Sequence, residues 1–116
     1  MKEKTMVVVK SDGTTFEVAA KRASDDSVDL QQLQGLVGGM IELVQPQTAT
    51  LRGADIWANE EGLIHRLPFN RVASAATGVP LVGDVVIVPT AKRALHAIRS
   101  VVVSAGGEPS RTSLDA

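Results

Sequence analysis

The chain has 116 residues, and its 12 basic and 13 acidic side chains leave a net charge of −1. This length predicts one domain with a core of its own, and the balanced charge argues against binding that depends mainly on nucleic-acid phosphates. Because the chain contains no cysteine, disulfides, thiolate metal sites and cysteine nucleophiles are excluded.

The aromatic and apolar residues argue against two further classes of protein, those that bind nucleic acids by stacking bases and those that carry a signal or membrane-spanning segment. The aromatic residues are Phe16, Trp57 and Phe69, which are too few and too scattered to form a surface on which nucleic-acid bases stack. The apolar run at residues 6–9 is too short for a signal sequence or a membrane-spanning helix. The sequence therefore predicts a cytoplasmic protein without membrane contact.

The first half of the chain predicts a β-hairpin, a helix and a third strand. The β-branched residues at 5–10 and 14–19 predict two strands joined by the turn sequence Ser11-Asp12-Gly13. Leucine and valine at positions 30, 33, 36 and 37 predict a helix with one buried side. Ser27 or Asp29 is expected to cap this helix, and Gly38-Gly39 to end it. Residues 40–44 predict the next strand.

The second half predicts strands at 54–58, 63–65 and 85–88 and helices at 71–77 and 91–102. Asn70 and Thr90 are the expected N-caps of the two helices. Together the elements predict an α+β fold: a mixed, mainly antiparallel sheet with an N-terminal β-hairpin and two to three short helices packed on it. Residues 1–104 are expected to form a single globular domain, and residues 105–116 a flexible C-terminal tail.

Four segments of the chain carry a resemblance to a known family. They are Gly38-Gly39-Met40-Ile41-Glu42-Leu43-Val44, Asn59-Glu60-Glu61-Gly62, Leu67-Pro68-Phe69-Asn70-Arg71 and Leu81-Val82-Gly83-Asp84-Val85-Val86-Ile87-Val88. Their order resembles a family of small, functionally uncharacterised proteins of actinobacteria and their bacteriophages. The resemblance covers residues 30–88 and leaves the N-terminal hairpin and the last helix outside. It implies a phage or mobile-element accessory protein and supplies no catalytic residue.

The polar residues predict no catalytic centre and no metal site. The two histidines, His65 and His96, have no spacing that brings metal ligands to one helix face. Glu60 and Glu61 form a carboxylate pair, but their place in a turn favours solvated surface charges. The glycine-rich segment ends a helix, where phosphate is repelled, and no Gly-x-Ser-x-Gly motif is present. The chain is therefore predicted to be non-enzymatic and to use no cofactor.

Residues around the predicted helix at 71–77 form a candidate ligand- or partner-binding site. They are Trp57, Asn59, Glu60, Arg66, Asn70 and Arg71. A capped helix start with two arginines and a tryptophan nearby favours a small anionic ligand. In the alternative interpretation, Asn70 only caps the helix and Trp57 packs in the core. Arg71 would then pair with Glu60 or Glu61.

The last predicted helix carries a candidate basic face formed by Lys92, Arg93, His96 and Arg99. Positions 92, 96 and 99 follow the i, i+4, i+7 repeat and share one side of a helix. Such a face favours phosphates or an acidic partner, and the alternative is the solvated side of an amphipathic helix.

The leading hypothesis is a non-enzymatic phage or mobile-element accessory binding protein in the host cytoplasm. It is expected to bind a host protein or to self-associate as a homodimer through exposed strand edges. One alternative is a protein that sequesters a small anionic nucleotide. Another is a nucleic-acid-binding accessory protein that uses the last helix.

Overall fold

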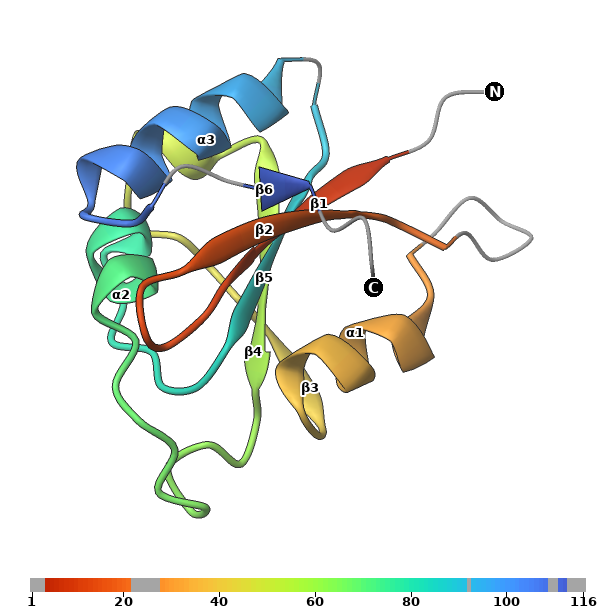
Figure 1. Ribbon diagram of the computed structural model, residues 1–116, viewed down its shortest axis with the longest axis vertical. Helices are drawn as coiled ribbons and strands as arrows, with labels where there is room; N and C mark the ends of the chain where they lie inside the picture. The colour runs from red at the N-terminus through yellow and green to blue at the C-terminus, as the bar shows by residue number, and fades with distance from the viewer. Residues whose placement is uncertain (1–3, 22–27, 92, 109–110, 113–116) are drawn as a thin grey trace.

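The computed structural model describes residues 4–21, 28–91, 93–108 and 111–112. Figure 1 shows how the elements formed by these residues are arranged. In chain order they are β1 (Thr5–Val9), β2 (Thr15–Ala19), α1 (Leu30–Val37), β3 (Ile41–Val44), η1 (Ala49–Leu51), β4 (Ala54–Asn59), α2 (Arg71–Thr77), β5 (Val85–Pro89), α3 (Ala94–Ser104) and β6 (Arg111–Thr112). None of the helices in these ranges has the length and apolar content that a membrane span needs.

The strands form one sheet in the order β3-β4-β5-β1-β2-β6. Neighbouring strands are antiparallel except for β2 and β6, which are parallel. The predicted fold class is therefore confirmed: the sheet is mixed and mainly antiparallel, begins with the β1–β2 hairpin, and carries three α-helices. The short strand β6 lies in the segment expected to be a tail.

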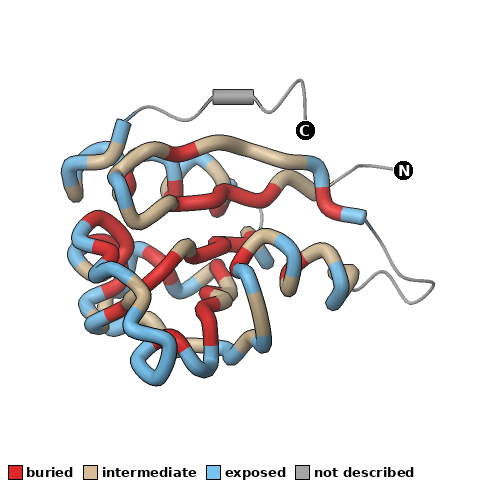
Figure 2. The backbone as a smooth tube through the Cα atoms, turned by 60° about the horizontal axis from the view of Figure 1, so that its bottom comes forward, coloured by how far each residue is buried: buried red, intermediate tan, exposed pale blue. Residues whose placement is uncertain are grey.

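The sheet lies between two helical layers, with α2 and α3 over one face and α1 over the other (Figure 1). Val7 and Ile87 on the central strands β1 and β5 face α2 and α3, whereas Val8 and Val86 face α1. All four side chains are buried, and Figure 2 shows these strands as the buried centre of the molecule. A strand as apolar as β5 needs cover on both faces, and the two layers provide it.

Local sequence signals explain the turn and caps that form as expected. In the β1–β2 turn, Lys10 N donates to Thr14 O over 2.9 Å. The Asp12 carboxylate accepts from Thr14 Oγ1 and N over 2.7 and 3.0 Å, and these hydrogen bonds lower the pKa of Asp12. Asp29 caps α1 by accepting from Gln31 N, while Ser27 lies outside the described residues. Both α1 and α2 end at a glycine in the left-handed conformation, Gly38 and Gly78.

Three predictions about local structure are wrong. Residues 63–65 form turns instead of a return strand, and no described strand pairs with them. The last helix begins at Ala94 after Arg93, whose φ of 67° is left-handed, so Thr90 is not its cap. Thr90 N instead donates to Gly53 O over 2.7 Å. Leu30, expected on the buried side of α1, is exposed because it lies at the first turn of the helix.

Candidate partner-binding surface

A pocket of about 240 Å³ lies where the β4–α2 connection meets β3, β4 and the segment before β5. We call it the loop pocket. Its apolar lining consists of Ala58, Leu63, Phe69, Pro80, Leu81 and Val82. Gly62, Asn59, Glu42 and Glu60 complete the lining.

The β4–α2 connection has a defined backbone because it is hydrogen-bonded within itself. Glu61 N donates to the Asn59 side-chain oxygen over 2.8 Å, and Leu67 N donates to Gly62 O over 3.0 Å. Gly83 N donates to Pro68 O over 2.7 Å and ties the connection to the segment before β5. The side chains that project from this loop are therefore presented on an ordered scaffold, which lowers the entropy cost of binding.

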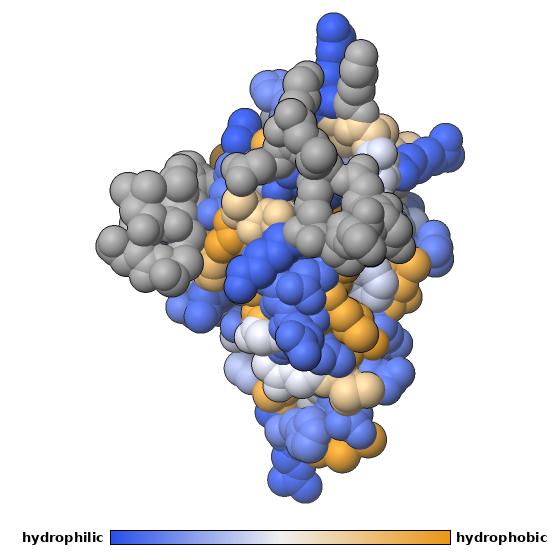
Figure 3. Space-filling model, turned by 90° about the vertical axis from the view of Figure 1, so that its right-hand side faces the viewer, coloured by the Kyte–Doolittle hydropathy of each residue, from blue (hydrophilic) through white to orange (hydrophobic). Residues whose placement is uncertain are grey.

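Three large apolar side chains of this loop face solvent. Leu63 is 81% exposed, Ile64 76% and Phe69 56%. We refer to these residues together with the loop pocket as the loop surface. Figure 3 shows apolar side chains beside hydrophilic ones at the lower end of the molecule, where this loop lies in Figure 1. Clustered apolar residues with a polar rim mark interaction sites more often than isolated exposed leucines do.

The charged residues of the loop pocket are acidic. Glu42 and Glu60 line it and are both exposed, and neither forms an ion pair with a described residue. The neighbouring Glu61 lies 3.4 Å from His65, measured from Oε1 to Nε2. The pocket therefore combines apolar walls with negative charge, and none of the described basic side chains lines it.

The structure brings only part of the candidate site together. Asn59 and Glu60 line the loop pocket. Trp57 lies on the opposite face of the sheet, packed against the core beneath α1, and its indole N–H has no acceptor among the described residues. Arg66 is exposed in the loop with a left-handed φ of 54°, and the exposed Arg71 guanidinium lies beside Gly106 after α3.

Asn70 is fully buried, and its side chain is occupied within the protein. Nδ2 donates to Val9 O over 2.9 Å and to Gly83 O over 2.8 Å, and Oδ1 accepts from Ala73 N over 2.9 Å. These bonds connect β1, the segment before β5 and the start of α2. Asn70 therefore fixes the position of α2, and its side chain offers no free group to a ligand.

Arg99, on the candidate basic face, is engaged by the sheet. Its Nε and Nη2 atoms each lie 2.7 Å from a carboxylate oxygen of Glu17 on β2, and these hydrogen bonds raise the pKa of Arg99. Arg93 and His96 are exposed, whereas Lys92 lies outside the described residues. The Glu17 carboxylate offsets the positive charge of Arg99, so the face is less basic than its sequence suggests.

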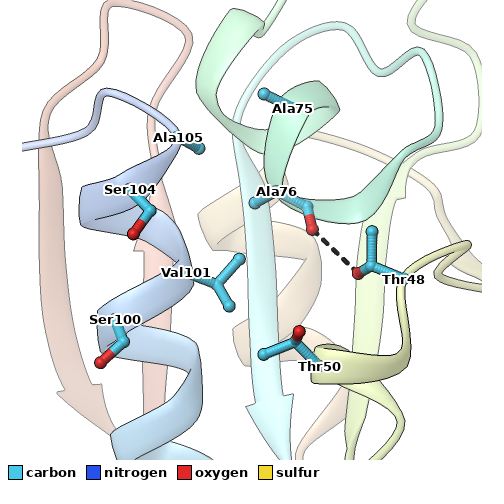
Figure 4. Close-up of a pocket in the computed structure, with 8 residues that line it drawn as sticks. All are labelled: Thr48, Thr50, Ala75, Ala76, Ser100, Val101, Ser104 and Ala105. Carbon is cyan, nitrogen blue, oxygen red and sulfur yellow. Dashed lines mark hydrogen bonds between the residues drawn. The ribbon is translucent and has the colours of Figure 1, made fainter.

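A larger hollow of about 440 Å³ separates α3 from α2 and η1 (Figure 4). It is lined by short, uncharged side chains: Thr48, Thr50, Ala75, Ala76, Ser100, Val101, Ser104 and Ala105. Val101 projects from α3 toward α2 and η1, and Thr48 Oγ1 donates to Ala76 O over 3.1 Å. Its lining offers neither charge nor an aromatic ring to fix a ligand. In the described part of the chain, no three histidine or acidic side chains cluster as metal ligands either.

Sequence reasoning missed Leu63 and Ile64 as surface residues because residues 63–65 were predicted to form a strand. The available signal was that the residues after them, His65 and Arg66, do not continue an apolar–polar alternation. A short apolar pair between a turn and a proline fits an exposed loop equally well.

These features define the class of protein. It is a three-layer α+β protein with a pocket at one end of its sheet, and the walls of this pocket are mainly apolar while its charged residues are acidic. Residues 1–104 match the family model described as "Domain of unknown function (DUF3846)", and the chain belongs to this family. No curated protein and no solved structure matches the chain. The prediction that the chain belongs to an uncharacterised family is therefore confirmed. The predicted extent of the resemblance, residues 30–88, is wrong, because the family match also includes the β1–β2 hairpin and α3.

Proposed function

We propose that the protein is a non-enzymatic accessory binding protein that holds a partner protein through the loop surface. The observation that carries this proposal is the exposure of Leu63, Ile64 and Phe69 on an internally hydrogen-bonded loop. Complete burial of side chains of this size contributes roughly 1.5–3 kcal/mol each. A partner that covers all three therefore gains several kcal/mol before the cost of association is subtracted.

The size and charge of the loop pocket favour a protein partner over an anionic nucleotide. At about 240 Å³ it is smaller than the roughly 300–1,000 Å³ typical of small-molecule sites, and it suits one or two side chains of a partner. Glu42 and Glu60 would repel a phosphate group. Nucleic-acid binding through α3 has less support, because Arg99 is already paired with Glu17.

The biological setting comes from the sequence resemblance. A family shared by actinobacteria and their phages favours an accessory protein of a phage or mobile element. Its partner is then a protein of the actinobacterial host, met in the cytoplasm. Self-association as a homodimer is the alternative way of covering the exposed apolar side chains.

Pull-down from actinobacterial lysate tests the proposal. The immobilised wild-type chain should retain a stoichiometric partner, and the double variant Leu63→Asp, Phe69→Asp should lose most of it. Two carboxylates placed in a desolvated interface should weaken binding at least about tenfold, which corresponds to ~1.4 kcal/mol. Val103→Asp is the matched control, because Val103 is 48% exposed on α3, away from the loop pocket.

Circular dichroism should confirm that all three proteins are folded. Capture of the same partner by the wild type and the double variant would contradict the proposed surface. Repeated failure of the wild-type chain to retain any stoichiometric partner would contradict the proposed function itself.

A further inference from the structure

Strand β3 is an edge strand whose free backbone groups can be identified from its pairing with β4. Glu60 N donates to Met40 O over 2.8 Å, and the register continues with Glu42 opposite Ala58. In an antiparallel pair, residues that bond to the neighbouring strand alternate with residues whose N–H and C=O point away. Ile41 and Leu43 therefore direct their backbone groups to the open edge, and no described residue bonds to them there.

The loop pocket borders this same edge. Glu42 lines the pocket from β3, and its cross-strand neighbour Ala58 lines it from β4. Residues opposite each other in a sheet project to the same face. A strand added beside β3 would therefore place the residue opposite Glu42 on the pocket side. Its flanking residues would project to the other face, where the 47% exposed Leu43 lies opposite Trp57.

The negative charge at the open edge of β3 determines which kind of strand can pair with it. Glu42 and Glu60 are exposed acids without an ion-pair partner among the described residues, and the rest of the pocket wall is mainly apolar. A second copy of β3 would bring another Glu42 to the same edge, and like charges so close are destabilising. A segment that carries lysine or arginine would instead offset the negative charges of Glu42 and Glu60.

We propose that the partner docks as an extended segment that adds a strand to β3. An aliphatic or aromatic side chain of this segment enters the loop pocket, and a lysine or arginine on the same face lies against Glu42 and Glu60. The occupant is thus an apolar, basic stretch of a protein that adopts a β-strand on binding. This inference rests on the proposed function and specifies how the partner is held.

Two substitutions at one position separate the backbone contribution from the side chain. Leu43→Pro removes the N–H that points to the open edge, and proline is tolerated where an edge strand faces solvent. Leu43→Ala shortens the same side chain and keeps the N–H, so it is the matched control. Ile41→Pro removes the other outward N–H and replaces Leu43→Pro if that variant does not fold.

The probe is a display library of random ten-residue peptides selected on the full-length chain. We expect enriched peptides to combine an apolar residue with lysine or arginine two positions away, the spacing that places both on one face of a strand. Binding of a selected peptide should fall at least tenfold in Leu43→Pro and much less in Leu43→Ala. Selection on Glu42→Lys should lose the preference for basic residues.

The proposal is overturned if no peptide is enriched, if the enriched peptides lack basic residues, or if the proline variants bind as tightly as the wild type. Sedimentation equilibrium that finds a dimer dispersed by Leu43→Pro would identify a second copy as the occupant instead. Loss of partner capture in the Leu63→Asp, Phe69→Asp variant with full capture by Leu43→Pro would retain the proposed function and reject strand addition.

Discussion

Replacement of Asn70 by alanine is expected to lower the free energy of unfolding by about 3–7 kcal/mol. The substitution removes the N-cap of α2, which typically costs about 1 kcal/mol. It also leaves the carbonyl oxygens of Val9 and Gly83 without the amide that satisfies them, at roughly 1–3 kcal/mol for each buried group. Because domains are stable by only about 5–15 kcal/mol, this change would remove a large share of the total.

Urea unfolding followed by circular dichroism measures this effect. Asn70→Asp retains the acceptor for Ala73 N but places a carboxylate oxygen against Val9 O and Gly83 O, so this variant should also be strongly destabilised although the cap is kept. Gln31→Ala is the control, since Gln31 is an exposed amide side chain of α1 and its removal should change stability by less than about 0.5 kcal/mol. A loss no larger than about 1 kcal/mol in Asn70→Ala would show that Asn70 acts only as a cap.

Gly62→Ala is expected to destabilise the protein by about 1–3 kcal/mol and to weaken partner binding as well. A Cβ atom at position 62 would lie 2.6 Å from Val82 Cγ2 and 3.4 Å from Asn59 O. Val82 is β-branched and has few rotamers, so the loop must move away from it. Since Gly62 and Val82 both line the loop pocket, this movement deforms the proposed binding surface.

Gly35→Ala provides the control within the same chain. A Cβ atom there meets nothing within 4 Å, and the position is inside α1. This variant should gain about 0.5–1 kcal/mol, because alanine favours a helix over glycine. Urea unfolding gives both stabilities, and partner capture gives both binding effects. Unchanged stability and capture in Gly62→Ala would contradict the close packing of the loop against Val82.

The elements that sequence predicted correctly are those set by neighbouring residues. The Asp12-Gly13 turn, the Asp29 cap and the 71–77 helix each depend on contacts within a few positions of the chain. The continuous apolar run of β5 likewise required cover on both faces, wherever the covering helices came from.

The candidate site depended on contacts between distant residues and was predicted only in part. The bond from Asn70 to Val9 spans 61 positions, and nothing near Asn70 in sequence indicates that its amide is used up inside the fold. Arg99 is paired with Glu17 across 82 positions, a pairing that helix periodicity alone does not reveal. The loop pocket was missed for the same reason, because its walls come from β3, β4, the β4–α2 loop and residues 80–82.

Crosslinking from Ile64 is the most direct test of the proposal that the loop surface holds a partner. Ile64 is 76% exposed and does not line the pocket, so a photo-reactive amino acid can replace it without disturbing the fold. We expect irradiation in lysate to attach one partner covalently through position 64 and to attach none through position 103. Equal adducts from both positions, or an adduct from position 103 alone, would contradict the proposal.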